Sequence, residues 1–336
     1  MKFPRPIAYS FSLLLISVAV YFSGKFLQKK SDDKLAKQEI KEQKQLKEKV
    51  KEIKKPEADF YKISLPDNSK NVKSTYKFPS VSRVRVGAAI ELNNKKVLWA
   101  KDANKSVPIA SLTKCLTILT VLDYIEKNPQ HSLLDEIPIS KSAMKTSSSV
   151  FLRKYPKSTV TLKELLITAM VKSSNDSCQL LAEYFGKGNP NIFIQMMNTK
   201  AKEIGMNQTR MSNSHGLPFS RENPKLDNHS SMSDLLHLVR IIIKKYPFVL
   251  KWTSMRSVSY PEKSSKAVKL NNTNPLLPVK GVNGFKTGFT INAGWCQILT
   301  LRSNNNFYFI GLTGCPTKNT RDVTMRALMN WAVRTQ

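Results

Sequence analysis

Residues 285–313 read FKTGFTINAGWCQILTLRSNNNFYFIGLT. Three runs rich in β-branched and aromatic residues, 285–290, 295–302 and 307–313, are separated by short polar turns, a pattern typical of consecutive antiparallel strands. Helical periodicity then returns over residues 320–333. The end of the chain therefore predicts antiparallel strands closed by a helix.

Two further strand-like runs lie far away, at residues 83–92 and 96–100 around the turn Asn93-Asn-Lys95, and predict a hairpin. Between the two sets, residues 112–125 and several segments of 162–243 have helical apolar spacing. Strands at both ends of a helical middle predict an α/β fold of the α+β type. Its antiparallel sheet would be flanked by helices, with a mostly helical subdomain inserted at about residues 130–245.

The first 79 residues differ in composition from the rest. Residues 1–28 contain an apolar run, Ile7 to Phe22, behind Lys2 and Arg5, which predicts a signal anchor or a signal peptide. Bulky residues stand where a cleavage site needs small ones, so an uncleaved anchor is favoured. Residues 29–79 predict a charged Lys/Glu-rich stalk and linker, with a weak coiled coil as the alternative. The folded domain is expected at 80–336.

The chain is strongly basic, with 54 Lys and Arg against 24 Asp and Glu and a net charge of +30. Such an excess suits nucleic acid, an anionic membrane or an anionic wall polymer. No zinc finger, aromatic RNA-binding run or recognition helix is present, so no nucleic acid is expected. The cysteines and histidines lack the spacing of a zinc site, so no metal or cofactor is expected.

Cys296 and Cys315 fall almost opposite each other when residues are counted outward from the turn at 303–306. An oxidising compartment could join them in a disulfide. Two buried free thiols are the alternative.

The pattern Ser-x-x-Lys places a hydroxyl and an amine one helical turn apart on the same face, where a neutral Lys can take the Ser proton. The pattern occurs four times, starting at Ser31, Ser74, Ser111 and Ser142. Only Ser111-Leu-Thr-Lys114 opens a strongly apolar helix that a core can bury. Ser111 is therefore the candidate nucleophile.

Two more triplets follow in order, Ser173-Ser-Asn175 beside the helical segments and Lys286-Thr-Gly288 at the start of a strand. Together with Ser111-Leu-Thr-Lys114 they resemble the motif set of penicillin-binding proteins and class A β-lactamases. Residues 108–114, 165–176, 214–217, 274–277 and 281–290 extend the resemblance to serine-type D-alanyl-D-alanine carboxypeptidases, the low-molecular-mass penicillin-binding proteins, over about residues 81–333. The fold implied is β-lactamase/transpeptidase-like, and the domain 80–336 becomes a catalytic domain.

The resemblance assigns a role to each motif residue. Ser111 would attack the carbonyl of the penultimate D-Ala of a peptidoglycan stem peptide ending in D-Ala-D-Ala, with Lys114 as base. Ser173 would relay the proton to the leaving amine, and water would then hydrolyse the acyl-enzyme. β-Lactam antibiotics would be covalent inhibitors. The substrate-binding residues implied are Asn175, Lys286, Thr287, Gly288 and Phe289.

The expected electrostatics follow from this arrangement. Repulsion from Lys286 and partial burial should lower the Lys114 pKa. The backbone N–H groups of Ser111 and Phe289 would form the oxyanion hole. Two positions depart from the family pattern, because Ser174 stands where Gly is frequent and Phe289 where His is frequent. His215, in Ser214-His-Gly-Leu217, is expected to be structural.

Other interpretations stay open. Ser111 and Ser173 could be helix N-caps, and Lys286 a solvated charge on a strand. A class A β-lactamase would need a Glu in an E-x-x-L-N pattern, and the stretch Glu222-Asn-Pro-Lys-Leu226 has the wrong spacing. A membrane-tethered basic binding module would explain the charge without catalysis.

Peptidoglycan stems lie outside the cytoplasmic membrane, so we expect an enzyme anchored in a bacterial cytoplasmic membrane with its catalytic domain outside, or secreted if the N-terminal segment is cleaved. The lysines just after the apolar run favour the opposite orientation, but large translocated domains often override that charge bias. The chain ends at Gln336, before the C-terminal domain and membrane helix that many relatives carry. Membrane attachment is therefore expected through residues 1–28.

Overall fold

The computed structural model describes residues 63–69, 72, 76–148, 150–219 and 223–335. The expected anchor and nearly all of the expected stalk lie outside these residues. Within them, no helix combines the length and apolar character needed to cross a bilayer. The anchor, the stalk and the domain boundaries therefore stay predictions.

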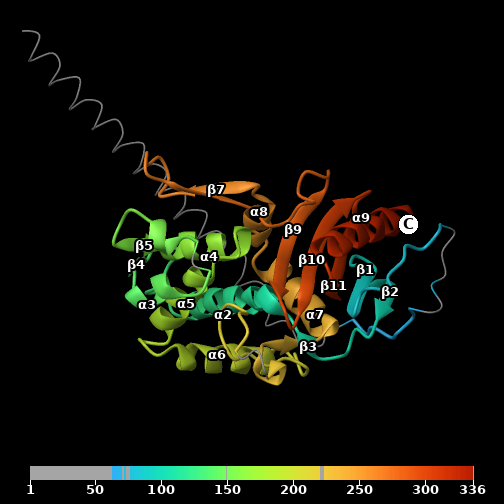
Figure 1. Cartoon of the computed structure of the whole chain (residues 1–336), viewed down its shortest axis with the longest axis horizontal. Coiled ribbons are helices and arrows are strands. Elements are labelled where there is room, and N and C mark those ends of the chain that lie inside the picture. The colour runs from blue at the N-terminus through green and yellow to red at the C-terminus, as the bar shows by residue number, and fades with distance from the viewer. Residues whose placement is uncertain (1–62, 70–71, 73–75, 149, 220–222, 336) are drawn as a thin grey trace, which may run out of the picture. The chain divides into compact units, whose positions relative to one another are not determined.

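An antiparallel sheet of five strands organises the described part of the chain, in the order β2-β1-β11-β10-β9 (Figure 1). The N-terminal strand pair joins the C-terminal strands through β1 and β11. These two strands pair along the whole length of β1, from Val86 opposite Thr313 to Glu91 opposite Tyr308. This confirms a sheet built from both ends of the domain. The strands are β1 (Val86–Glu91), β2 (Lys96–Lys101), β9 (Val282–Thr290), β10 (Gly294–Ser303) and β11 (Asn306–Cys315).

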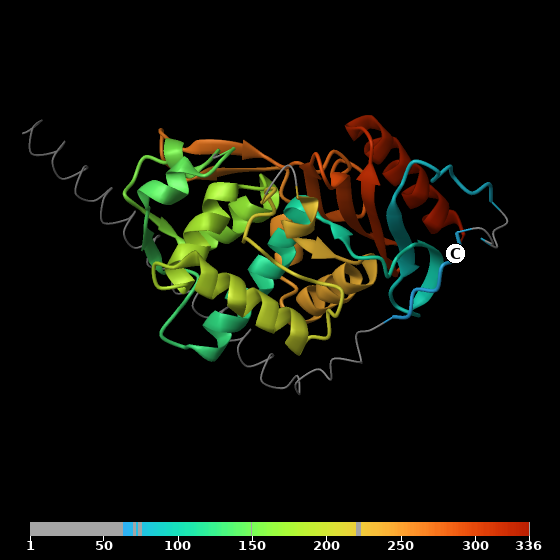
Figure 2. The ribbon, with the colours of Figure 1, turned by 60° about the horizontal axis from the view of Figure 1, so that its bottom comes forward.

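Each face of the sheet is covered by helices (Figures 1 and 2). Along β1, Ala88 and Ile90 belong to the core shared with the helical part, whereas Ala89 belongs to the core under the C-terminal helix α9 (Lys318–Arg334). This is the period of two that a strand buried on both faces requires. The sheet is therefore a packed middle layer.

The helical part follows the chain between β2 and β9. Its helices are α2 (Lys114–Lys127), α3 (Lys141–Lys145), α4 (Leu162–Val171), α5 (Asn175–Phe185), α6 (Pro190–Glu203), α7 (Met232–Lys245) and α8 (Val249–Ser254), with short 3-10 helices η2 (Ala110–Thr113), η3 (Leu152–Lys154) and η4 (Pro224–Leu226). Three small antiparallel pairs, absent from the sequence expectation, brace it: β3 (Val107–Pro108) with β6 (His229–Ser230), β4 (Glu136–Pro138) with β5 (Thr159–Thr161), and β7 (Ser257–Tyr260) with β8 (Val268–Asn271).

Residues 63–69 run along the outer strand β2. Leu65 is buried in the core, and the Asn104 side chain donates a hydrogen bond to its carbonyl. The backbone N–H of Asn68 donates to the carbonyl of Ala100, and the Asn68 side chain accepts from the N–H of Ala100 at 2.7 Å. This part of the expected linker therefore packs against the sheet.

All four cysteines are free and buried. The pairing of Cys296 with Cys315 in a disulfide is therefore wrong, and the alternative of free thiols is right. A register shift between β10 and β11 places Cys315 opposite Trp295. Counting outward from the turn missed this irregularity.

Candidate active site

Ser111 and Lys114 lie where the chain leaves the pair β3–β6 and enters helix α2. Ser111 belongs to the short helix η2, and Lys114 is the first residue of α2. The Lys114 Nζ donates a hydrogen bond to the Ser111 Oγ over 3.0 Å. The N-cap positions of η2 and α2 are Ile109 and Thr113. The Ser111 hydroxyl therefore does not cap a helix; it accepts from the amine predicted from the spacing and donates to the His215 carbonyl at 3.5 Å.

The Lys114 side chain is fully buried and held by two further acceptors. Its Nζ donates to the Asn175 Oδ1 at 2.8 Å and to the backbone carbonyl of His215 at 2.5 Å. Burial disfavours the ammonium form and lowers the pKa of Lys114 to about 8. About a tenth of the Lys114 amines are therefore neutral at pH 7, beside the Ser111 hydroxyl.

The second motif forms the turn between α4 and α5. Ser173 adopts a left-handed backbone conformation, with φ of 64°, and Asn175 begins α5. The N-cap of α5 is Ser174, which makes no side-chain capping bond, so Ser173 is not a cap either. Among the described residues the Ser173 hydroxyl has no hydrogen-bond partner. Asn175 links the two motifs directly, because its Oδ1 binds Lys114.

Lys286 lies on β9, with only 1% of its surface exposed, so it is not a solvated strand charge. Burial, with the positive charge of Lys114 as the second cause, lowers the pKa of Lys286 to about 7. Its Nζ donates to the carbonyl of Thr287 at 2.8 Å. Burial is the main cause of the lowered pKa at both lysines, and the expected repulsion contributes at Lys286 but not at Lys114.

The backbone of β9 passes close to the nucleophile. A Cβ atom placed on Gly288 would lie 3.0 Å from the backbone nitrogen of Ser111. Glycine is therefore the residue that lets β9 approach this closely. The approach brings the strand that carries the third motif beside Ser111.

Phe289 follows this glycine and points outward, with 51% of its surface exposed. Its ring stacks on Trp295 from β10, with 4.2 Å between ring centroids and 27° between ring planes. The backbone partner of Phe289 across the strands is the same Trp295. Position 289, where His is frequent in the family, is thus occupied here by one member of a stacked aromatic pair.

His215 contributes its backbone to the site. Its carbonyl accepts from Lys114, while its Nδ1 accepts from the N–H of Leu217 at 3.2 Å. Burial, with the nearby charge of Lys114 as the second cause, lowers the pKa of His215 to about 3, so the ring is neutral. The ring is therefore a hydrogen-bond acceptor within its own loop.

Three contacts at the site involve groups that were not among the site residues predicted from the sequence. The Ser147 carbonyl accepts from the Asn175 Nδ2 at 3.2 Å, and the Thr273 hydroxyl lies 2.6 Å from the Thr287 hydroxyl. The third is the His215 carbonyl. Two of the three partners are backbone carbonyls, which every residue possesses, so side-chain patterns could not have identified them.

Together the three motifs converge on one hydroxyl with a buried amine beside it, a second buried lysine and a closely approaching strand. This set of groups suits acyl transfer through a serine ester. Glu222, considered for a β-lactamase, lies outside the described residues.

The sequence profile of the D-alanyl-D-alanine carboxypeptidases matches residues 75–310, which is most of the chain and includes every motif described above. The chain belongs to the D-alanyl-D-alanine carboxypeptidase family. The family predicted from the sequence, a family of serine hydrolases, is thereby confirmed.

The curated relatives of this chain are named after two activities, carboxypeptidase and endopeptidase. The chain is 29% identical over 245 residues to D-alanyl-D-alanine carboxypeptidase DacF of Bacillus subtilis, covering 72% of this chain and 60% of that protein. It is 31% identical over 239 residues to a D-alanyl-D-alanine endopeptidase of Pseudomonas aeruginosa, covering 68% of this chain and 71% of that protein. The chain therefore spans only about three fifths of the Bacillus relative.

Solved structures share the fold. Penicillin-binding protein D2 from Listeria monocytogenes, in its cefotaxime-bound form, superposes with a TM-score of 0.65 at 27% identity, covering 77% of this chain and 99% of that chain. A D-alanyl-D-alanine carboxypeptidase from Mycobacterium tuberculosis has a TM-score of 0.68 at 22% identity, covering 79% and 97%. The predicted β-lactamase/transpeptidase-like fold is confirmed.

Proposed function

We propose that this family member is a serine D-Ala-D-Ala carboxypeptidase that removes the terminal D-alanine from peptidoglycan stem peptides through an acyl-enzyme on Ser111. The observation that carries the proposal is the hydrogen bond of 3.0 Å between Lys114 and Ser111, made by an amine whose pKa burial lowers to about 8. A lysine with an ordinary pKa would be protonated at neutral pH and could not act as base.

In the first step, the neutral Lys114 accepts the Ser111 proton while the Ser111 oxygen attacks the carbonyl of the penultimate D-Ala. The C–N bond to the terminal D-Ala then breaks, and the leaving amine takes a proton. We assign this delivery to Ser173, which passes its own proton to the amine and receives in return the proton that Lys114 took from Ser111; the Ser173 hydroxyl is free of partners among the described residues. Asn175 holds the Lys114 amine in place.

Charge stabilisation comes from β9 and η2. The backbone N–H groups of Ser111 and Phe289 are assigned to the oxyanion hole, and each such donor contributes ~3 kcal/mol in comparable reactions. The close approach of Gly288 to the Ser111 nitrogen supports this pairing. Lys286 and Thr287 are assigned to the terminal carboxylate. An incoming carboxylate stabilises the protonated form of Lys286, so substrate binding itself restores its charge.

Hydrolysis by water completes the cycle and frees Ser111. A β-lactam enters the same way, but its leaving amine stays tethered to the acyl group. Covalent inhibition by penicillin is therefore part of the proposal, and the β-lactam-bound forms of the Listeria relative support it.

The decisive experiment measures the intact mass of the full chain in detergent at intervals after penicillin is added, with Ser111→Ala as the matched control. We expect one persistent penicillin adduct on the wild type and none on the variant. Rapid loss of the adduct would favour a β-lactamase. The absence of an adduct on folded protein would reject Ser111 as nucleophile.

An endopeptidase is the second candidate, because the Pseudomonas relative, at 31% identity, carries that name. Both activities proceed through one acyl-enzyme and differ in the leaving amine. Purified cross-linked dimeric stems and linear pentapeptide stems, supplied separately, distinguish them. Release of D-alanine from the pentapeptide at the higher kcat/KM supports the carboxypeptidase, and faster conversion of dimer to monomer supports the endopeptidase.

We further propose that residues 1–28 anchor the enzyme in a bacterial cytoplasmic membrane with the catalytic domain outside, where its substrate lies. The apolar run from Ile7 to Phe22 supports this assignment. A reporter enzyme that is active only outside the cytoplasm, fused after residue 60, should be active. An inactive reporter at normal expression would contradict the orientation.

A further inference from the structure

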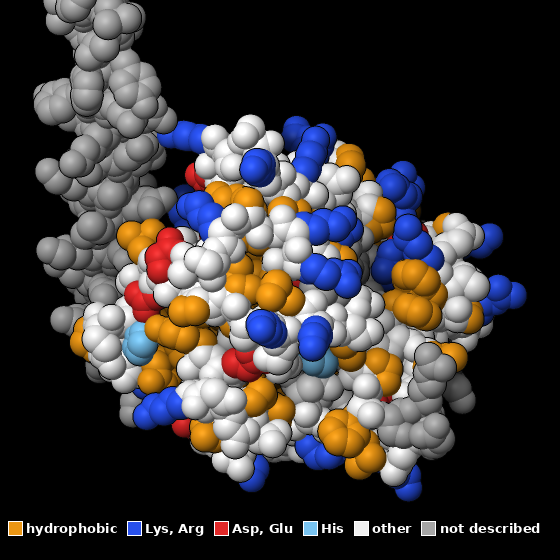
Figure 3. Space-filling model, turned by 60° about the vertical axis from the view of Figure 1, so that its left-hand side comes forward, with side chains coloured by type: hydrophobic (Ala, Val, Ile, Leu, Met, Phe, Trp, Pro, Cys, Tyr) orange, Lys and Arg blue, Asp and Glu red, His pale blue; other side chains and the backbone are white. Residues whose placement is uncertain are grey.

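Positive charge is concentrated in one stretch of the catalytic domain. Residues 63–336 hold 39 Lys and Arg against 16 Asp and Glu, but residues 249–280 hold six against one, Glu262. All six are exposed, and we call them the basic face. They are Lys251, Arg256, Lys263, Lys266, Lys269 and Lys280. Figure 3 shows Lys and Arg side chains scattered over the upper and central surface, with few acidic side chains among them.

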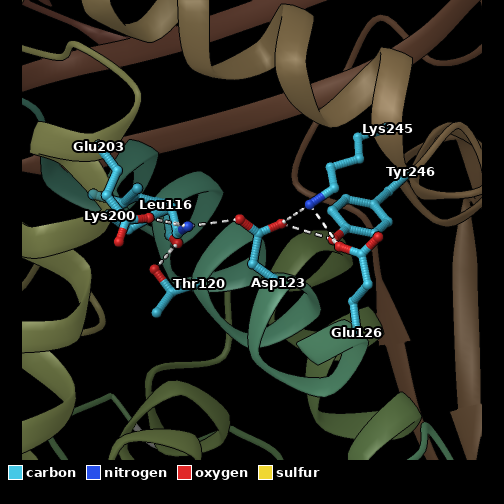
Figure 4. A network of polar contacts seen from close by, with 8 residues as sticks. All are labelled: Leu116, Thr120, Asp123, Glu126, Lys200, Glu203, Lys245 and Tyr246. Carbon is cyan, nitrogen blue, oxygen red and sulfur yellow. Dashed lines mark hydrogen bonds and ion pairs between the residues drawn. The ribbon is translucent and has the colours of Figure 1, made fainter. Parts of the chain in front are cut away.

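The cations of the basic face differ from lysines that this fold uses internally. Lys200 and Lys245 both contact the carboxylate of Asp123, at 2.8 and 2.7 Å, and each has a second acidic partner (Figure 4). By contrast, five of the six cations on the basic face make no ion pair with any described residue: Lys251, Arg256, Lys266, Lys269 and Lys280. Their charge is thus available to an external partner.

The hairpin β7–β8 gives the basic face its form. Val258, Tyr260 and Leu270 are buried, whereas the alternate positions face outward, so Ser259 and its cross-strand partner Lys269 are exposed together. Lys263 and Lys266 lie in the connection between the two strands. From Arg256 to that connection the extended chain covers ~20 Å. Arg256, Lys263, Lys266 and Lys269 therefore follow the hairpin as a row, which suits a linear polyanion.

The base of the hairpin lies beside the active site. Asn272, just after β8, donates its backbone N–H to the carbonyl of Arg256 at 2.8 Å. The next residue, Thr273, donates its N–H to the carbonyl of Val171, two residues before Ser173, and its hydroxyl lies 2.6 Å from that of Thr287. One end of the row of cations therefore reaches the turn that carries the second motif and the strand that carries the third.

We propose that the basic face binds a linear polyanion with a phosphodiester backbone, such as a glycerol-phosphate wall polymer, and holds it alongside the active site. The partner supplies regularly spaced negative charge to exposed cations, five of which make no ion pair with any described residue. Binding of this kind releases counterions and needs no apolar contact. It goes beyond the acyl-transfer chemistry and does not depend on it.

The composition of the basic face argues against two other polyanionic partners. Proteins that lie on a bilayer bring apolar side chains to its surface, and single-stranded nucleic acids are held by stacking on exposed aromatic rings. No large hydrophobic side chain between residues 249 and 280 is exposed, and Trp252 and Tyr260 are both buried. A polymer without bases and without a lipid phase fits this surface best.

The test measures binding of the full chain, in detergent, to a fluorescent poly(glycerol phosphate) at 50 and 200 mM salt. The test variant carries Lys251→Glu, Arg256→Glu, Lys266→Glu and Lys269→Glu. The control variant carries the same change of net charge at exposed lysines elsewhere, namely Lys96→Glu, Lys202→Glu, Lys244→Glu and Lys318→Glu. Thermal unfolding of each variant verifies folding first, and the milder pair Lys266→Ala and Lys269→Ala serves if the test variant does not fold.

With six contacts, wild-type affinity should fall on the order of a thousandfold between the two salt concentrations. The test variant should lose at least about tenfold in affinity at 50 mM salt, whereas the control variant should stay within about twofold. Equal loss in both variants would overturn the proposal, because net charge alone would then explain binding. So would the absence of wild-type binding at 50 mM salt, or tighter binding to phosphatidylglycerol vesicles or to single-stranded DNA than to the polymer.

Discussion

Gly216 packs directly against the backbone of Ala110, the residue before Ser111. A Cβ atom on Gly216 would lie 2.0 Å from the Ala110 carbonyl oxygen, and φ at Gly216 is +85°. We therefore expect Gly216→Ala to displace Ser111 and to slow penicillin adduct formation at least about tenfold. Gly188 is the matched control, because its φ is +90° but nothing lies within 4 Å of an added Cβ.

Gly188→Ala should cost only the backbone strain of about 1–2 kcal/mol and should leave adduct formation unchanged. Chemical denaturation and intact mass measure the two effects separately. Equal behaviour of the two alanine variants would show that the contact with Ala110 does not position the nucleophile.

The two buried lysines predict a bell-shaped pH profile. The reactive form has Lys114 neutral and Lys286 protonated, and burial lowers their pKa values to about 8 and about 7. Because the two groups are coupled, the limbs belong to the pair. Below about pH 7 both amines are protonated and no base exists, and above about pH 8 both are neutral and the carboxylate loses its partner.

The rate constant kcat/KM for adduct formation should therefore peak between pH 7 and 8 and fall about tenfold per pH unit well outside that interval. An ester of the same penicillin, which lacks the free carboxylate, should lose the high-pH limb. A profile that stays flat from pH 6 to 9 would be incompatible with this pair of lysines.

Lys114→Met removes the base and keeps an unbranched side chain of similar volume. Adduct formation should fall by about two to four orders of magnitude. Stability should respond to pH as well, because the folded wild type binds fewer protons than the unfolded chain between pH 8 and about 10.5, so the Lys114 contribution rises with pH.

The variant lacks this contribution. Relative to wild type, its free energy of unfolding should therefore fall by about 1.4 kcal/mol per pH unit between pH 8 and 10. Urea denaturation across this range measures the difference. A difference that does not change with pH would mean that Lys114 titrates normally.

Glu183, on the last turns of α5, is expected to position the site from a distance. Its two oxygens accept hydrogen bonds from Ser140 and Ser142, at 2.5 and 2.7 Å, and so fix the start of α3. The chain after α3 carries Ser147, whose carbonyl binds Asn175. Glu183→Ala should raise the KM for a pentapeptide substrate or slow acylation about three- to tenfold through looser positioning.

Glu183→Gln keeps one acceptor and should recover part of that loss. Glu203→Ala, which removes a half-exposed carboxylate paired with Lys200, is the control and should leave acylation unchanged. If Glu183→Ala acylates at the wild-type rate, the position of α3 does not affect the active site.

Phe289→His restores the residue that is frequent in the family. The oxyanion hole is assigned to the backbone N–H of this position, so acylation should stay within about threefold of wild type. Loss of the stacking on Trp295 should lower the free energy of unfolding by about 1 kcal/mol. A tenfold fall in acylation would assign the aromatic side chain a role in the reaction.

The strands of the sheet could be predicted from the sequence. Along each strand the residues either alternate between apolar and polar or are all apolar, and polar turns separate the strands. Predicted strand 307–313 became β11 at Asn306–Cys315, and the predicted helix 320–333 became α9 at Lys318–Arg334. The short pairs were missed, since β3 and β6 have two residues each and leave no periodicity to detect. The irregular register at Cys315 also depends on contacts between strands that local patterns do not carry.

At the site, spacing alone paired Ser111 with Lys114, and the ordered motifs added Asn175 and Lys286. The structure brings these together as expected. The cause of the low Lys114 pKa was only partly foreseen, because complete burial is a property of the packed fold. The assignment of roles to these residues stays a prediction that the experiments above test.

The pairing of β1 with β11 joins residues more than 200 positions apart in the chain. A nascent chain that ends before residue 282 contains β1, β2, Ser111 and Lys114. It lacks the three strands that complete the sheet, and it lacks Lys286. Pairing between such distant residues slows folding, because the loop between them must close before the contacts form. With the outward orientation proposed above, the polypeptide would cross the membrane before its sheet is complete, and Ser111 would meet Lys286 only once nearly the whole chain has emerged.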